Sequence, residues 1–174
     1  VLTLKEDEQA PLYDVQEDTE DDFWSDAAII HQYTRAQAIA DGFLIDVTER
    51  SKESGIKFPV ALTRAVWDDC VEWTDEDSHA QVYQDNSADP MTSGRLSDVV
   101  FMAYMAMKML ADKPVGQYDN AALTKVTESL LRYKILRVPR DGQSQKAEET
   151  ELKLQIGPGD NAEPVITIMQ LGED

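Results

Sequence analysis

Carboxylates are the residues of this sequence whose number and spacing could do chemistry. The chain contains 34 Asp and Glu residues, and Asp68 and Glu72 stand four positions apart, which places two carboxylates on one face of a helix. Such a pair can hold a divalent cation or act as general acid and base. Because so many acids produce such pairs by chance, the spacing does not specify a catalytic site. A carboxylate enzyme that uses a divalent cation is therefore the third of three hypotheses.

Nucleophilic chemistry has less support. Cys70 is the only cysteine, and on a helical wheel it falls beside Val66 and Trp73, so we predict that its thiol is buried. His31 and His79 lie far apart, and neither belongs to a local triad motif. We therefore predict a protein that is not an enzyme, with no catalytic residue, no cofactor and no metal ligand. A lone cysteine also excludes an internal disulfide framework and is typical of a reducing compartment.

The negative charge is concentrated in two segments. Residues 1–26 contain ten acidic residues and one lysine, and residues 68–89 contain eight acidic residues and no lysine or arginine. Together these segments carry −17 of the net charge of −18. This excess disfavours direct binding to DNA, RNA or an anionic membrane. We expect instead that the partner is a basic protein.

The first segment mixes its acids with apolar residues, among them Phe23 and Trp24. We interpret residues 1–26 as an acidic tail with aromatic anchors, followed by a single domain over residues 27–174. Acidic blocks of this kind are also common as solvated tails without a partner. Both interpretations of the tail stay open.

The second segment is predicted to form a negative ridge on a helix over Val60–Trp73. Apolar residues fall on one half of that helical wheel, and the acids from Asp68 onward fall on an arc of about 120° on the other half. A loop over residues 77–92 would extend the acidic surface. The residues that we predict to bind the partner, from both segments, are Asp18, Glu20, Asp21, Asp22, Phe23, Trp24, Asp68, Asp69, Glu72, Asp75, Glu76 and Asp77.

Bases also cluster once, in the last third of the chain. The cluster can neutralise the protein's own acidic tail or contact the acids of a partner, and the excess of acid favours the first alternative. Its members are Arg132, Lys134, Arg137 and Arg140.

The elements that must position these residues follow from capping and periodicity. Short helices are predicted over Arg35–Asp41 and Glu49–Ser54, begun by Thr34 and Thr48 and each closed by a glycine. A long helix from Ser93 or Gly94 to about Ala111 contains an uncharged run, so we predict a central core helix that is apolar on both faces.

The last third of the chain is predicted to be sheet. Three strands, over residues 126–138, 151–156 and 164–169, form an antiparallel meander, and Gly157-Pro158-Gly159-Asp160 joins the last two by a type II turn. That turn lacks the following helix of a phosphate-binding loop. The predicted fold is therefore α+β, with N-terminal helices, a central apolar helix and a C-terminal three-stranded antiparallel meander.

Several blocks of the sequence resemble a known family. They are YTRAQAIADG at 33–42, PVALTRAVW at 59–67, GPGD at 157–160, EPVITIM at 163–169 and GED at 172–174. These blocks are similar to an uncharacterised bacterial domain family that is commonly borne on plasmids or phages. The resemblance implies a mobile-element origin and a location in the bacterial cytoplasm, and it implies no activity and no catalytic residue.

Our leading hypothesis is a non-enzymatic acidic inhibitor that mimics DNA and occupies the basic nucleic-acid-binding surface of a host protein. Clustered carboxylates can approximate the charge density of duplex DNA, which is about one charge per 1.7 Å of axis. For a mobile element, the natural targets are host defence complexes such as CRISPR or restriction systems. The alternative is an accessory or structural subunit of a plasmid- or phage-encoded assembly that docks through the acidic tail.

Overall fold

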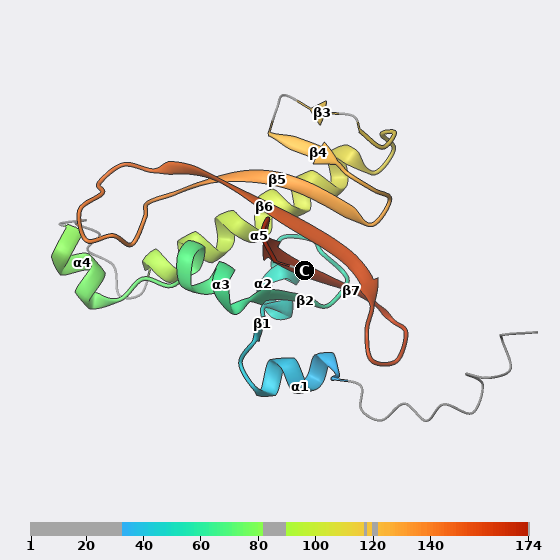
Figure 1. Ribbon diagram of the computed structural model, residues 1–174, viewed down its shortest axis with the longest axis horizontal. Helices are drawn as coiled ribbons and strands as arrows, with labels where there is room; N and C mark the ends of the chain where they lie inside the picture. The colour runs from blue at the N-terminus through green and yellow to red at the C-terminus, as the bar shows by residue number, and fades with distance from the viewer. Residues whose placement is uncertain (1–32, 82–89, 117, 120–121, 174) are drawn as a thin grey trace, which may run out of the picture. The chain divides into compact units, whose positions relative to one another are not determined.

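The centre of the fold is a mixed sheet of seven strands. The computed structural model describes residues 33–81, 90–116, 118–119 and 122–173. The strands lie in the order β1-β2-β7-β6-β5-β4-β3 (Figure 1). Neighbouring strands are antiparallel except for β2 and β7, which are parallel. The strands are β1 (Leu44–Asp46), β2 (Val60–Thr63), β3 (Tyr118–Asp119), β4 (Leu123–Lys125), β5 (Leu130–Arg137), β6 (Glu148–Pro158) and β7 (Pro164–Gln170).

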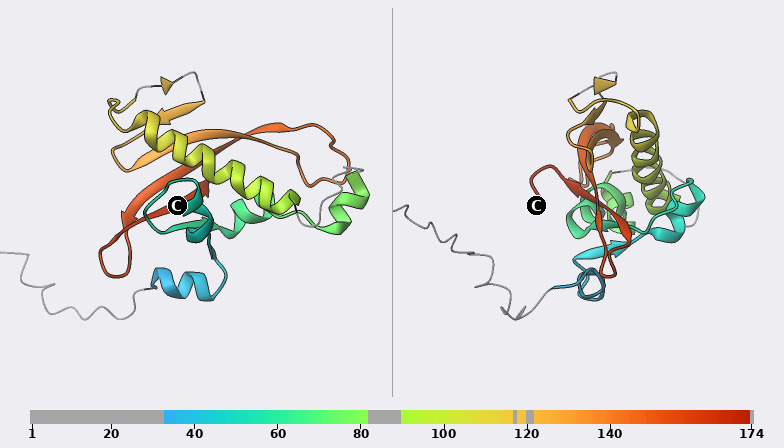
Figure 2. Two further views of the ribbon diagram at one scale, coloured as in Figure 1. Left: turned by 180° about the vertical axis from the view of Figure 1, so that it is seen from behind. Right: turned by 90° about the vertical axis from the view of Figure 1, so that its right-hand side faces the viewer.

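One long helix covers one face of this sheet (Figure 2). It is α5 (Pro90–Leu110), and its inner side buries Val99, Ala103 and Ala106 against sheet residues such as Leu152 and Leu154. Among the described helices, none combines the length and the apolarity that crossing a membrane requires. The other helices are short: α1 (Arg35–Ala40), α2 (Thr48–Glu53), α3 (Arg64–Val66), the π-helix η2 (Trp67–Val71) and α4 (Asp75–Gln81).

The predicted fold class is wrong in its sheet. The three C-terminal strands do pair antiparallel, but they do not form a separate three-stranded meander. Strand β7 also pairs with β2 from the N-terminal half, and β4 pairs with β5 on the other side. Parallel pairing between β2 and β7 joins segments about a hundred residues apart, and a local sequence pattern carries no information about it.

The predicted central helix is also placed wrongly. Helix α5 lies over one face of the sheet, and its outer side faces solvent, where Phe101 is 51% exposed. The uncharged run therefore does not indicate burial on both sides. It includes apolar side chains, such as that of Phe101, that remain at the surface.

The predicted helix over Val60–Trp73 begins as a strand. Val60, Ala61 and Leu62 are fully buried between β1 and β7, and a continuous apolar run is typical of a strand that is covered on both faces. Helical structure begins only at Arg64 and continues as the π-helix η2. A π-helix has more residues per turn than an α-helix, so the predicted arc of acids is not kept.

Several local predictions are confirmed. Thr34 forms a capping box with Gln37 at the start of α1, and Gly42 follows with φ +78°. Gly55 closes α2 with φ +97°. Two details are wrong: Thr48 is the first residue of α2 rather than its cap, and residues 77–81 and 90–92 of the predicted loop are helical.

The hairpin between β6 and β7 does not contain the predicted type II turn. That turn needs a positive φ at Gly159, whereas among the described residues positive φ occurs at Ala162 in this hairpin and at other glycines elsewhere. The backbone N–H of Ala162 instead donates to the carbonyl of Gly159 at 3.0 Å.

Candidate functional site

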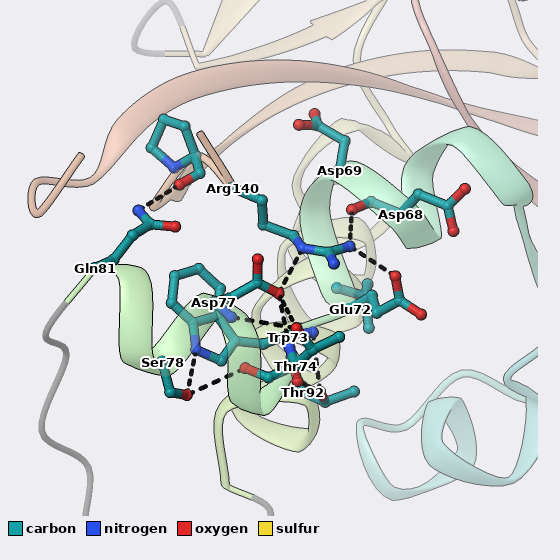
Figure 3. A network of polar contacts seen from close by, with 12 residues as sticks. Asp68, Asp69, Glu72, Trp73, Thr74, Asp77, Ser78, Gln81, Thr92 and Arg140 are labelled. Carbon is teal, nitrogen blue, oxygen red and sulfur yellow. Dashed lines mark hydrogen bonds and ion pairs between the residues drawn. The ribbon is translucent and has the colours of Figure 1, made fainter. Parts of the chain in front are cut away.

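The second acidic segment is described over residues 68–81, and we call this part the acidic segment. It packs against the connection between β5 and β6. Figure 3 shows this region, in which η2 and α4 lie on either side of Arg140. Arg140 follows β5, some seventy positions after the acids that surround it. Gln81, at the end of α4, is fully buried and donates from Nε2 to the carbonyl oxygens of Pro139 and Ser144 at 2.8 and 2.5 Å. The acidic segment is therefore fixed to the sheet at several points.

Arg140 binds three groups of this segment. Its Nε donates to Asp77 Oδ2 at 2.9 Å, and its Nη1 donates to Glu72 Oε2 at 2.6 Å and to the carbonyl of Asp68 at 2.9 Å. Burial lowers the pKa of Arg140, but the hydrogen bond to Glu72 and the charge of Asp77 outweigh it and raise the pKa above its ordinary value. One arginine thus ties η2, the following loop and α4 together.

Asp77 also caps the helix on which it stands. Its carboxylate accepts hydrogen bonds from the backbone N–H and the hydroxyl of Thr74, both at 2.8 Å, while Thr74 Oγ1 accepts from the N–H of Asp77 at 3.2 Å. This is the reciprocal pattern of a capping box. Burial raises the pKa of Asp77, but the bonds from Thr74 and the charge of Arg140 outweigh it, so the pKa lies below its ordinary value.

A second arginine binds Asp69. Arg137 Nη2 lies 3.0 Å from Asp69 Oδ1, and Arg137 Nε lies 3.2 Å from Asp69 Oδ2. This two-point contact is the strong form of an arginine–carboxylate pair. In Figure 3 Asp69 points away from Arg140, which binds its neighbours.

A third arginine, Arg95 of α5, binds backbone rather than carboxylates. It is 8% exposed, and its nitrogens donate to the carbonyls of Asp69, Val71 and Val138 at 2.9 to 3.2 Å. Its guanidinium also lies 5.0 Å from the ring centre of Trp73. Arg95 therefore closes the end of η2, where helix carbonyls lack partners.

The thiol of Cys70 is buried, as predicted, at 1% exposure. Burial and the neighbouring Asp69 raise its pKa to about 12, so that very little of the nucleophilic thiolate form exists near neutral pH. The hydroxyl of Tyr133 is buried without a hydrogen-bond partner among the described residues, and burial raises its pKa well above the ordinary value. Neither group is prepared for nucleophilic catalysis.

The predicted binding residues therefore fall into three groups: acids paired with arginines, exposed acids, and residues that the structure does not describe. Asp69, Glu72 and Asp77 are engaged by Arg137 and Arg140. Asp68 keeps 51% of its side chain exposed, with Arg64 Nη1 at 3.7 Å. Asp75 and Glu76 are exposed at the start of α4, and neither has an ion pair within the described residues. The other predicted residues, Asp18, Glu20, Asp21, Asp22, Phe23 and Trp24, lie outside the residues that the structure describes.

The basic cluster is used mainly within the chain. Arg137 and Arg140 bind the acidic segment, and Lys134 pairs with Glu149 at 2.7 Å. Arg132 is exposed, and no ion pair joins it to another described residue. Sequence reasoning found these bases but missed Arg95 and Gln81. Their only signal in the sequence was position: Arg95 precedes an apolar run, and Gln81 follows a cluster of acids. Many residues at a protein surface have such a position.

The segments that carry the family resemblance also meet in space. Asp160 accepts from the backbone N–H of Arg35 and Ala36 at 2.7 and 2.9 Å, and so caps α1. Arg35 Nη1 donates to Thr167 Oγ1 at 2.9 Å. The hydroxyl of Thr63 donates to Glu173 at 2.8 Å. The first two contacts join α1 to β7 and its hairpin, and the third joins β2 to the residues after β7. The blocks that carry the resemblance therefore contact one another in the fold.

Within residues 33–81, 90–116, 118–119 and 122–173, no three His, Cys, Asp or Glu side chains are grouped so that they could hold a metal ion. Asp68 and Glu72, the pair considered for a cation, are turned to different arginines, Arg64 and Arg140. What the described site offers chemically is fixed charge. Its inner carboxylates are neutralised by arginines, and a few carboxylates beside them stay exposed.

Comparison with protein-family models identifies a match over most of the chain. A protein-family model described as "Family of unknown function (DUF6573)" matches residues 20–174. No curated protein and no solved structure matches the chain.

Proposed function

The chain belongs to the family of unknown function DUF6573, and from this premise we propose that it is a non-enzymatic acidic protein that binds a basic surface of a partner protein. The observation that carries the proposal is the division of charge in the acidic segment. Arg137 and Arg140 neutralise its inner carboxylates, while Asp75 and Glu76 stay exposed on an anchored helix.

The anchoring supports a binding role because fixed charges bind with a smaller loss of side-chain and backbone freedom than mobile ones. Helix α4 is held at its start by the Thr74–Asp77 capping box and at its end by Gln81. Trp73, two residues before the helix, donates from Nε1 to Ser78 Oγ at 3.0 Å. Asp75 and Glu76 are thus presented from a defined position.

The described acids alone give a smaller surface than the ridge that the sequence predicts. We therefore propose that residues 1–26, with ten acidic residues and one lysine, supply most of the charge that meets the partner. Asp68, Asp75 and Glu76 supply the part that is fixed on the domain. Electrostatic complementarity of this kind sets the rate and orientation of binding more than its final affinity.

We propose a nucleic-acid-binding protein of the host as the partner, because such proteins carry basic surfaces shaped for a regularly spaced negative charge. In this proposal the chain mimics DNA, acts in the bacterial cytoplasm and originates from a plasmid or phage. Host defence complexes of the CRISPR or restriction type are the expected targets.

The test is capture from a bacterial lysate on the immobilised full chain, eluted by a salt gradient and identified by mass spectrometry. We expect a nucleic-acid-binding protein that elutes as salt rises and is displaced by sheared duplex DNA. The variant Asp75→Asn/Glu76→Gln should release it at lower salt. The matched control is Asp112→Asn/Glu49→Gln, which removes the same charge from two exposed carboxylates elsewhere.

Two results would count against the proposal. Capture of proteins encoded beside this chain, unaffected by salt or DNA, would favour the accessory or structural subunit. Equal effects of the test and control variants would mean that only overall charge matters, and that Asp75 and Glu76 are not a binding surface.

A further inference from the structure

The outer side of α5 carries an apolar stripe that the described fold leaves in contact with solvent. Phe101 is 51% exposed, and Met105 beside it is partly exposed. On a helical wheel with about 100° per residue, both side chains point away from the buried side formed by Val99, Ala103 and Ala106. Phenylalanine and methionine are enriched at protein interfaces.

A groove extends this stripe over the sheet. It has a volume of about 440 Å³ and is lined by Phe101, Met102, Ile135 and Leu136, among others. Leu136 is 66% exposed, one of the most exposed large apolar side chains among the described residues. The apolar surface therefore extends beyond one helix, as a stable interface requires.

The two ends of the stripe carry opposite charges. Asp98 lies on its N-terminal side and Lys108 on its C-terminal side, and both are exposed. Neither has an ion pair within the described part of the chain, although Lys108 Nζ lies 5.7 Å from the ring centre of Tyr104. The rise of an α-helix separates the two positions by about 15 Å.

This arrangement is symmetric about Ala103. Asp98 and Lys108 are each five positions from it, and Phe101 and Met105 are each two positions from it. If two copies of the helix lie antiparallel, Asp98 of each copy faces Lys108 of the other, and Phe101 of each faces Met105 of the other. Such self-complementarity is the condition for a two-fold interface, in which one surface serves both copies.

We propose that the occupant of the α5 stripe is a second copy of this chain, bound through antiparallel contact of the two α5 helices. The dimer is closed by two Asp98–Lys108 ion pairs and two Phe101–Met105 contacts. This proposal concerns a different surface from the acidic segment and goes beyond the proposed function.

The test is sedimentation equilibrium of the full chain and of charge variants. We expect the natural chain to form a dimer. Asp98→Lys alone and Lys108→Asp alone should each raise the dissociation constant at least about tenfold, because each places like charges opposite one another at both ends. An equimolar mixture of these two variants should dimerise again, since every contact in the mixed pair joins opposite charges. Lys113→Asp, at an exposed lysine off the stripe, should leave the dissociation constant unchanged.

The recovery in the mixture makes the test independent of folding, because a misfolded variant cannot regain binding when another is added. A natural chain that stays monomeric up to about 1 mM, where binding free energy is only about 4 kcal/mol, would overturn the proposal. So would a dimer that tolerates both single variants, or a mixture that stays as weak as its components.

Discussion

At the scale of single residues, Arg140 contacts three residues of the acidic segment. It contacts the carboxylates of Glu72 and Asp77 and the carbonyl of Asp68, with 22% of its own side chain exposed. Each of these bonds is charge-assisted and only partly solvated, which makes it stronger than an exposed surface pair. An arginine from a distant part of the chain therefore holds two carboxylates of the acidic segment.

We expect Arg140→Ala to lower the free energy of unfolding by about 1–3 kcal/mol, because it leaves two half-buried carboxylates without their partner. Urea unfolding followed by circular dichroism measures this change. Arg132→Ala is the control. That arginine is exposed on β5, the strand before Arg140, and its loss should lower the free energy of unfolding by less than about 0.5 kcal/mol. Equal effects of the two variants would show that the Arg140 contacts do not hold the segment.

The lowered pKa of Asp77 predicts a dependence of stability on pH. In the unfolded chain the group titrates at about its ordinary 3.8, and in the folded protein it titrates lower. Between the two values the unfolded state binds more protons, so stability falls as pH decreases. The stabilisation by Asp77 is thus present above pH 3.8 and is lost as pH falls through the folded pKa.

Asp77→Asn checks this. The difference in unfolding free energy between the natural chain and the variant should be constant above about pH 5 and should shrink below it. Urea titrations at a series of pH values measure the difference. A difference that does not shrink as pH falls below 3.8 would show that its charge contributes nothing.

At the scale of elements, a short helix with its capping residues close by could be predicted, whereas a strand defined by distant partners could not. Thr34, Gln37 and Gly42 specify both ends of α1 within nine residues, so that helix could be predicted from the sequence. Val60–Leu62 could not, because their strand is defined by β1 and by β7. The same apolar run fits a helix or a doubly covered strand.

Gly55 illustrates how closely the elements fit. Its φ of +97° disfavours any residue with a side chain, and a Cβ placed there would lie 3.3 Å from the ring of Tyr104 on α5. We expect Gly55→Ala to lower the unfolding free energy by about 1–2 kcal/mol, the cost of a left-handed conformation.

The matched control for Gly55→Ala is Gly94→Ala, measured by the same urea unfolding. Gly94 lies within α5 and has open space around it, so alanine there should stabilise by about 0.5–1 kcal/mol through helix propensity. Destabilisation by both substitutions, or by neither, would contradict this account of the two glycines.

At the scale of the molecule, the positions of the acids in the chain could be predicted, but their ion-pair partners could not. The sequence located Asp69, Glu72 and Asp77 in a charged segment, yet their partners Arg137 and Arg140 come more than sixty residues later. Only the fold brings these groups together. A count of charge therefore overstated the acidic surface that the folded domain presents.

The described core predicts that residues 33–174 fold by themselves. Its buried apolar residues run from Val47 to Ile168, and they include every strand from β2 to β7 except the short β3. We expect the shortened chain to show one cooperative urea transition with the circular dichroism of a mixed helix and sheet protein. A spectrum of an unfolded chain would mean that residues 1–32 are needed for folding.

The position of β7 has a consequence for synthesis on the ribosome. β7 is made after every other described strand, yet it lies between β2 and β6 and joins the two parts of the sheet. Until Gln170 has left the exit tunnel, the nascent chain holds β1 and β2 apart from β3–β6, each part with an open edge. Open edges of this kind invite pairing with other chains. Nascent copies of this protein should therefore be prone to such pairing until β7 has joined the sheet.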